Sequence, residues 1–392
     1  MPQDRSRIIR RLRSALLAAV GVILFLIGAG YVIITQFPSV GAYGADLLRD
    51  VVGDQAVARL ETASLEIQDA VHTAAHKLGH LKPLAPWALV TRENPATPPP
   101  LAPPAAESTR VAPPRWPPRP LAPLGSVQGE GQWLAYLSDS TGATVAYRTF
   151  LQPDSTRPYA VVAIVAFDLE KTALEFVLGT EEPASKVSVD RPGTIPAVDR
   201  CPGRLLAVFN GGFKARHGYF GVRVGGVTVI PAREGFGTVE VAADGHTRIG
   251  IWGTDIVPSR DARFWRQNGP LIVHDGQVNP HTADTDPLNW GFTVAGVTAT
   301  WRSALGISAD DKTLFYIAGP SLTMRALARA VAACGASQAI QLDINSYWVH
   351  FEAIHAAESR LHAQPLLESM KNGTGRYFSP YSRDFFYVVA AR

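Results

Sequence analysis

The chain has 392 residues, with 37 lysines and arginines against 34 aspartates and glutamates and a formal net charge of +3. The excess is more than accounted for by arginines near the start of the chain, at Arg5, Arg7, Arg10, Arg11 and Arg13. The remainder carries no basic excess, which argues against a nucleic-acid partner. The length suits one membrane segment and one large domain.

Residues 15–34 form an apolar run without a single charge. A helix of about 20 residues crosses a hydrocarbon core of about 30 Å, so the run predicts a transmembrane helix. The basic tail at 1–14 precedes it, and the positive-inside rule then places this tail in the cytoplasm and the main domain outside. The alternative is a cleaved signal peptide, but the length of the run favours an uncleaved anchor. We therefore expect a single-pass cell-membrane protein.

Apolar residues recur at helical spacing over 45–80, interrupted at Gly53, and predict a juxtamembrane helical segment. His72, His76 and His80 share one face of this helix at a spacing that suits a transition metal. No carboxylate or cysteine completes such a shell, so we assign no metal site here.

Proline dominates the next segment, 93–125, with twelve prolines between Pro95 and Pro123. A chain in polyproline II extends by about 3.1 Å per residue, so ~30 residues reach on the order of 90 Å. The segment predicts a linker that holds the following domain away from the membrane.

The remainder, 130–392, consists of short β-rich segments separated by turn signals such as Gly225-Gly226 and Asp275-Gly276. A helix pattern at 321–334 lies between two β-like runs, which suggests a strand-helix-strand unit with parallel strands, and a second helix is expected near 352–369. The fold class predicted is α+β, a strand-rich mixed-sheet domain. Cys201 and Cys334 are compatible with a disulfide or with two free thiols.

Polar residues follow two apolar runs at the point where each run ends. Asp343, Asn345 and Ser346 come after the second β run of the unit, and a carboxylate there acts as base, nucleophile or metal ligand, or it closes a turn. Asn210 with Gly211-Gly212 ends the other run, where glycines admit a ligand to the backbone or form a tight turn.

Two further side chains are candidates for the same edge. Arg302 lies in an otherwise apolar run, and a buried guanidinium needs an anionic partner, either Asp343 or a substrate phosphate. Asn268 precedes the run that starts at Leu271 and offers another amide, although a simple loop also explains it.

Four blocks in this order resemble the phosphodiester glycosidase family, that of the mannose 6-phosphate uncovering enzyme, which has many bacterial envelope members. The blocks are Val208–Phe213, Gly269–Gly276, Trp301–Gly306 and Gln341–Asp343. Family members have a mixed α/β domain and hydrolyse the bond between the anomeric carbon of a sugar and a phosphodiester. The resemblance implies a binding role for Asn210, Gly211 and Gly212, a phosphate clamp at Arg302 and an acidic role for Asp343. We also predict that Asn268, Ser303, Asn345 and Ser346 bind the substrate.

The chain departs from the family pattern directly after the aspartate, where a glycine run and serine are usual and Ile344-Asn345-Ser346-Tyr347 stands instead. The departure implies either an altered substrate or a domain that has lost activity. The main hypothesis is a membrane-anchored, extracytoplasmic hydrolase of phosphorylated glycans in envelope polysaccharide or exopolysaccharide metabolism. The alternative is a non-catalytic glycan- or phosphate-binding module, and a third is a metal-dependent phosphodiesterase using Asp343 and His350. The sequence specifies no cofactor.

Overall fold

The computed structural model describes residues 38–87, 116–257, 261–284, 290, 296–357, 360–370 and 373–391. The chain divides into two units at Val57, and the domain that carries the motifs belongs to the unit from Ala58 onward. The predicted membrane span 15–34 lies outside the described residues. Among the helices that are described, none combines the length and the apolar character needed to cross a bilayer.

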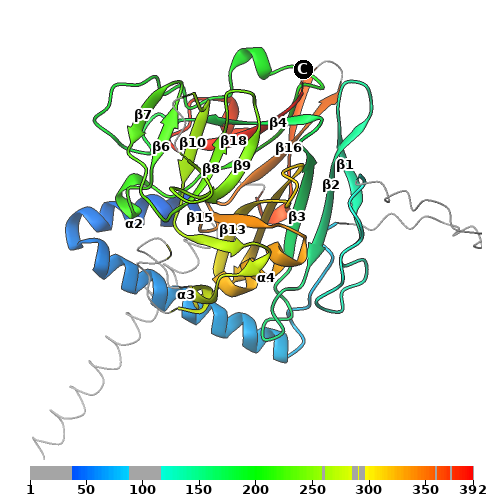
Figure 1. Cartoon of the computed structure of the whole chain (residues 1–392). Coiled ribbons are helices and arrows are strands. Elements are labelled where there is room, and N and C mark those ends of the chain that lie inside the picture. The colour runs from blue at the N-terminus through cyan, green and yellow to red at the C-terminus, as the bar shows by residue number, and fades with distance from the viewer. Residues whose placement is uncertain are drawn as a thin grey trace, which may run out of the picture. The chain divides into compact units, whose positions relative to one another are not determined.

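Three antiparallel sheets build the domain (Figure 1). The eight-stranded sheet runs in the order β1 (Leu134–Ser138), β2 (Thr144–Leu151), β3 (Val162–Asp168), β14 (Thr313–Leu322), β13 (Thr300–Ile307), β15 (Gln338–Ile344), β11 (Leu271–His274) and β12 (Gln277–Val278). A five-stranded sheet contains β17 (Arg360–Pro365), β16 (Phe351–Ala357), β5 (Leu205–Asn210), β18 (Phe385–Ala390) and β4 (Thr172–Val177). The second five-stranded sheet contains β7 (Val227–Ile230), β6 (Val222–Val224), β10 (Phe264–Gln267), β8 (Gly237–Val241) and β9 (Thr247–Ile251).

The eight-stranded sheet is apolar on both faces, because its side chains alternate between two cores. In β3, Ala163, Val165 and Phe167 pack toward the sheet of β5 and β18, whereas Val162, Ile164 and Ala166 pack toward helix α4 (Met324–Ala333). Aromatic rings fill the space between the two sheets, as where Phe209 of β5 meets Tyr316 of β14 with ring centroids 4.7 Å apart. The domain is therefore strand-rich α+β, as predicted.

Helix α4 confirms the predicted strand-helix-strand unit but corrects the pairing of its strands. Thr323 caps the helix, since its hydroxyl accepts the N–H of Ala326 at 3.1 Å. Strands β14 and β15 run in the same direction, yet both pair antiparallel with β13, which lies between them. Parallel pairing therefore does not form, because a strand from earlier in the chain occupies the position between them.

The prediction of a helix near 352–369 is wrong. These residues form β16 and β17 and a short 3₁₀ turn at Glu368–Met370. The alanines of this stretch favour helix locally, but Phe351 pairs with Phe209 in β5 and the strand becomes part of the sheet. Other 3₁₀ turns lie at Ala197–Asp199, Ala215–His217, Pro280–Ala283 and Arg376–Phe378.

The segment 45–80 contains two helices, α2 (Pro38–Val52) and α3 (Asp54–Lys77), separated by Gly53 at a φ of +86°. From Ala58 on, α3 is bound to the domain through a bidentate ion pair in which Arg157 donates to both oxygens of Asp69, at 2.7 and 2.6 Å. The hydroxyl of Tyr159 also donates to Asp69. His76 bonds the carbonyl of Leu81, and no metal-binding group of three or more ligands occurs among the described residues.

The end of the predicted linker is packed against the domain. Trp116 donates its indole N–H to the carbonyl of Thr144 and lies edge-on to Tyr147, and Leu121 donates its N–H to the carbonyl of Gly131. The earlier part, 88–115, lies outside the described residues. Both cysteines are free thiols, with Cys201 exposed and Cys334 buried at the C-terminal end of α4.

We expect the ion pair between Arg157 and Asp69 to stabilise the packing of α3, from Ala58 on, against the domain. The variant Asp69→Asn removes one partner of a half-buried bidentate pair, and we expect a local cost of about 1 to 2 kcal/mol. Amide hydrogen exchange over 62–76 is then expected to quicken by about 5- to 30-fold, while exchange in β3 stays unchanged. Glu66→Gln, an exposed carboxylate on the same helix, serves as the control. Unchanged exchange in Asp69→Asn would show that the pair does not hold the helix.

Candidate active site

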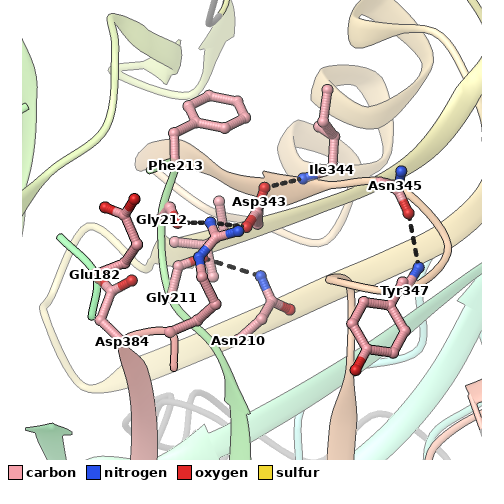
Figure 2. A network of polar contacts seen from close by, with 12 residues as sticks. Glu182, Asn210, Gly211, Gly212, Phe213, Asp343, Ile344, Asn345, Tyr347 and Asp384 are labelled. Atoms are coloured by element: carbon pink, nitrogen blue, oxygen red, sulfur yellow. Dashed lines mark hydrogen bonds and ion pairs between the residues drawn. The ribbon is translucent and has the colours of Figure 1, made fainter. Parts of the chain in front are cut away.

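The polar motifs converge where β5 and β15 end and β18 begins (Figure 2). The register of the sheet explains this, because Phe385, the first residue of β18, is paired with Asn210, the last residue of β5. Arg383 and Asp384 therefore lie directly beyond Asn210. The backbone N–H of Asp343 reaches the same point and donates to the carbonyl of Gly211 at 3.1 Å.

Asn210 joins three strands through its side chain. Its amide nitrogen donates to the Ser303 hydroxyl at 3.0 Å, and its amide oxygen accepts from the Tyr316 hydroxyl at 2.9 Å and from the His350 N–H at 3.1 Å. Ser303 in turn donates to the backbone carbonyl of Asp343 at 2.8 Å. Both predicted binding residues, Asn210 and Ser303, are buried and direct these hydrogen bonds to protein groups.

Gly211 and Gly212 are required by packing within the protein. A Cβ on Gly211 would lie 2.8 Å from the carboxylate of Asp384, and one on Gly212 would lie 2.9 Å from Oδ1 of Asn268. Asn268 holds this loop against β15, since its Oδ1 accepts the N–H of Phe213 at 3.0 Å and its Nδ2 donates to the carbonyl of Gln341 at 2.7 Å. The glycines thus allow buried side chains to approach this face of the backbone.

Asp343 is 6% exposed and carries the acidic group of the site. One carboxylate oxygen accepts the N–H of Ile344 at 2.9 Å, and the other forms a close ion pair with Arg383. Burial raises the pKa of Asp343 to about 6, against the opposing effects of Arg383 and the Ile344 N–H. The side chain therefore titrates close to neutral pH.

Arg383 is the guanidinium that pairs with Asp343. Its Nη2 also donates to the carbonyl of Gly212 at 3.0 Å, which fixes the side chain between the two motifs. The Trp348 ring lies 4.6 Å from the guanidinium carbon, and the ammonium of Lys214 lies 5.2 Å from the same ring. Two cations and an aromatic ring thus border the carboxylate.

Arg302, which the sequence suggested as a partner for Asp343, is not the guanidinium that pairs with it. Strand alternation directs it away from Ser303, toward the start of α4, where it donates to the carbonyls of Leu322 and Thr298, each at 2.9 Å. The side chain is fully buried, and burial lowers its pKa to about 9. In this arrangement Arg302 presents no exposed atom to a substrate, and its contacts hold the segment before α4.

A second buried ion pair supports the glycine loop. Arg266 donates to Asp384 at 2.8 Å and to the carbonyl of Phe213 at 2.7 Å, and both charged side chains are about 1% exposed. The loop from Asn210 to Phe213 is therefore held by Asn268 and Arg266, which both lie at the end of β10. His350 is also buried and bonds Glu352 at 2.8 Å, and burial lowers its pKa.

The residues after Asp343 form a turn in which Asn345 adopts a φ of +86°. Its side-chain oxygen accepts the N–H of Tyr347 at 2.8 Å, and its own N–H donates to the carbonyl of Trp301 at 3.1 Å. Asparagine is among the few residues other than glycine that tolerate this region. Ser346 is exposed at the tip of the turn.

Sequence reasoning placed Asp343, the glycine loop, Ser303 and Asn345 in one region, but it missed Arg383, Trp348 and Lys214. A weak signal for Arg383 exists, since the opposite charges of Arg383 and Asp384 directly precede the apolar strand β18. No local pattern marks Trp348 or Lys214, because their role depends on packing across the site.

A model of the phosphodiester glycosidase family matches residues 203–343. Among solved structures, the chain resembles the catalytic domain of zebrafish N-acetylglucosamine-1-phosphodiester alpha-N-acetylglucosaminidase auto-inhibited by its pro-peptide, with 14% identity, a TM-score of 0.41 and coverage of 67% of this chain and 88% of that chain. A hypothetical protein from Synechocystis matches with 10% identity, a TM-score of 0.32 and coverage of 66% of this chain and 62% of that chain. No curated protein matches the chain in sequence. The match ends at Asp343 and spans the four sequence blocks, so the predicted resemblance to this family is confirmed over residues 203–343.

Proposed function

We propose that the domain hydrolyses sugar phosphodiesters at the bond between the anomeric carbon and the phosphate oxygen. The family match supports this reaction, and the strongest structural support comes from the free hydrogen-bond donor of Arg383. Arg383 uses Nη2 for Asp343 and Gly212, whereas its Nη1 makes no hydrogen bond within the described part of the chain. A guanidinium that already touches the acidic residue thus keeps a donor for a phosphate oxygen.

The charges of the site suit this chemistry. Water bonds to the anomeric carbon while the bond from that carbon to the phosphate oxygen breaks, and the electron pair stays on the oxygen. The products are a free sugar and a phosphomonoester, which carries one more negative charge than the diester. Arg383 and Lys214, both beside Trp348, are placed to stabilise that developing charge.

Asp343 is the carboxylate that we assign to the anomeric carbon. The transition state of glycosyl transfer carries positive charge at that carbon, and an ionised carboxylate stabilises it or bonds to it. The ion pair with Arg383 holds the carboxylate in one rotamer, next to the group that would bind the phosphate. The anomeric carbon would then face Asp343 and the phosphate would face Arg383, and these two side chains already contact each other.

The cellular setting is a further part of the proposal and rests on the sequence. The apolar run 15–34 follows an arginine-rich tail, which supports a cytoplasmic N-terminus and an extracytoplasmic domain. A phosphorylated glycan of the envelope, such as exopolysaccharide, is then the substrate class within reach of the linker.

A glycan-binding module without turnover remains the second candidate. Asp343 and Arg383 are only 6% and 4% exposed, and the glycine run that usually follows the aspartate is absent. A site this enclosed admits a phosphate oxygen more readily than a whole sugar. Turnover by the full chain separates the two functions.

Asp343→Asn is expected to lower kcat on a sugar 1-phosphodiester by at least about 100-fold, because the amide cannot stabilise positive charge. Release of free sugar is the measurement, made on methyl phosphodiesters of N-acetylglucosamine and mannose. The control is Asp275→Asn, whose side chain is 77% exposed on the β11–β12 turn. Phosphate-dependent binding without release of sugar by the unaltered chain would favour the binding module.

Arg383→Lys keeps the charge but removes the planar guanidinium, whose Nη2 contacts Asp343 and Gly212 and whose Nη1 is assigned to the phosphate. We expect kcat/KM to fall by about 10- to 1,000-fold, with a larger loss for diesters than for neutral glycosides. Arg325→Lys on the exposed side of α4 is the matched control. Equal losses on charged and neutral substrates would contradict a phosphate-binding role for Arg383.

The pH dependence follows from Asp343, whose pKa burial raises to about 6. The carboxyl is protonated below that pH and ionised above it, so kcat/KM is expected to fall about tenfold per pH unit below pH 6 and to level off above it. Arg383 lowers the pKa of Asp343, and Arg383→Gln is therefore expected to move this limb to higher pH. A limb that stays in place in Arg383→Gln would exclude Asp343 as its source.

A further inference from the structure

The loop after β4 runs alongside the segment that carries Arg383. Glu181 and Glu182 both donate their backbone N–H to the carbonyl of Ser382, at 3.2 and 2.8 Å. The N–H of Gly179 donates to the carbonyl of Glu182 at 3.0 Å and closes the loop on itself. Because Ser382 directly precedes Arg383, these bonds fix Glu182 next to the proposed phosphate-binding group.

The carboxylate of Glu182 is held by one oxygen only. Its Oε2 accepts the N–H of Ala184 at 2.8 Å and that of Ala215 at 2.9 Å, and Ala215 follows Lys214 in the chain. Its Oε1 accepts no hydrogen bond from any described residue, and the side chain is half-buried. An anchored carboxylate with one free and accessible oxygen is suited to exchange a proton with a bound molecule.

Glu182 interacts electrostatically with Arg383, as Asp343 and Asp384 also do. Burial alone would lower the pKa of Arg383, but the carboxylates around it raise that pKa above its ordinary value. Asp343 contributes most to this effect, and Asp384 and Glu182 add to it. In Figure 2, Glu182 and Asp343 lie on either side of Gly212, whose carbonyl binds Arg383.

Other carboxylates are less suited to act with Asp343. Asp384 is 1% exposed and its Oδ2 is bound by Arg266, so it supports the glycine loop from within. Asp275 lies on the exposed β11–β12 turn beside Gln338, and Glu234 is exposed beside Gly253. Glu182 alone among these four combines an anchored position next to Arg383 with a free oxygen.

We propose that Glu182 is the second carboxylate of the site and takes the proton from the attacking water. The inference rests on the proposed hydrolysis of sugar phosphodiesters. The water oxygen bonds to the anomeric carbon, its proton passes to Oε1 of Glu182, and the bonding pair between that carbon and the phosphate oxygen goes to the phosphomonoester bound by Arg383. Asp343 stabilises the anomeric carbon, and the proton on Glu182 then leaves to solvent.

The test compares Glu182→Gln and Glu182→Ala with the adjacent exposed control Glu181→Gln in the full chain, on the methyl N-acetylglucosamine and mannose 1-phosphodiesters. Glu182→Gln is expected to lower kcat by about 100- to 10,000-fold with little change in KM, since general base catalysis contributes that range. Azide attacks the anomeric carbon without losing a proton, so it is expected to restore turnover in Glu182→Ala and to yield a glycosyl azide. A carboxylate that only braces the loop would show no such rescue.

The outcomes separate this inference from the reaction on which it rests. Turnover by the unaltered chain, loss in Asp343→Asn and near-normal kcat in Glu182→Gln would overturn the role of Glu182 alone. A loss in both Glu182 variants that azide does not restore, together with a lowered melting temperature, would also overturn it. No turnover by the unaltered chain on either diester would overturn the hydrolase and the inference together. Loss with azide rescue and an unchanged melting temperature supports it.

Discussion

The ion pair between Asp343 and Arg383 is the interaction on which the site depends. Removing two charges from water costs several kcal/mol per ion, and such a pair persists only where further hydrogen bonds satisfy it. Here the Ile344 N–H and the Gly212 carbonyl supply them. The pair therefore ties the end of β15 to the start of β18 and to the glycine loop. It also explains why the acidic residue stays charged in a nearly closed environment and why its pKa remains sensitive to the arginine.

The pair can form because the sheets fix where these strands begin and end. The register of β18 on β5 brings Arg383 beside Gly212, and the Asn210 side chain links β5 to β13 through Ser303. The buried pair of Arg266 with Asp384 closes the same loop from the second five-stranded sheet. The polar side chains of this network lie within strands or next to strand ends. The packing of the three sheets therefore sets the geometry at Asp343.

The sequence predicted the site correctly where a motif coincides with the end of a strand. It failed where the position of a side chain depends on which face of the sheet the side chain points to. The blocks around Asn210, Ser303 and Asp343 were predicted to meet, and they do. Arg302 was misplaced because neighbouring residues of a strand point to opposite faces, and which face carries the site depends on how β13 is covered. Arg383 lies 40 residues beyond Asp343 and becomes its neighbour only through the register of β18. Likewise, the pairing of β16 with β5 overrides the helical preference of its alanines.

The departure from the glycine run after Asp343 leaves a turn that the side chain of Asn345 itself stabilises. Asn345 adopts the positive φ that glycine reaches without cost, and its side chain closes the turn by binding the Tyr347 N–H. The turn therefore survives without glycine at this position. It leads to Trp348, whose ring contacts both Arg383 and Lys214. The altered sequence thus keeps a turn and places Trp348 beside Arg383 and Lys214.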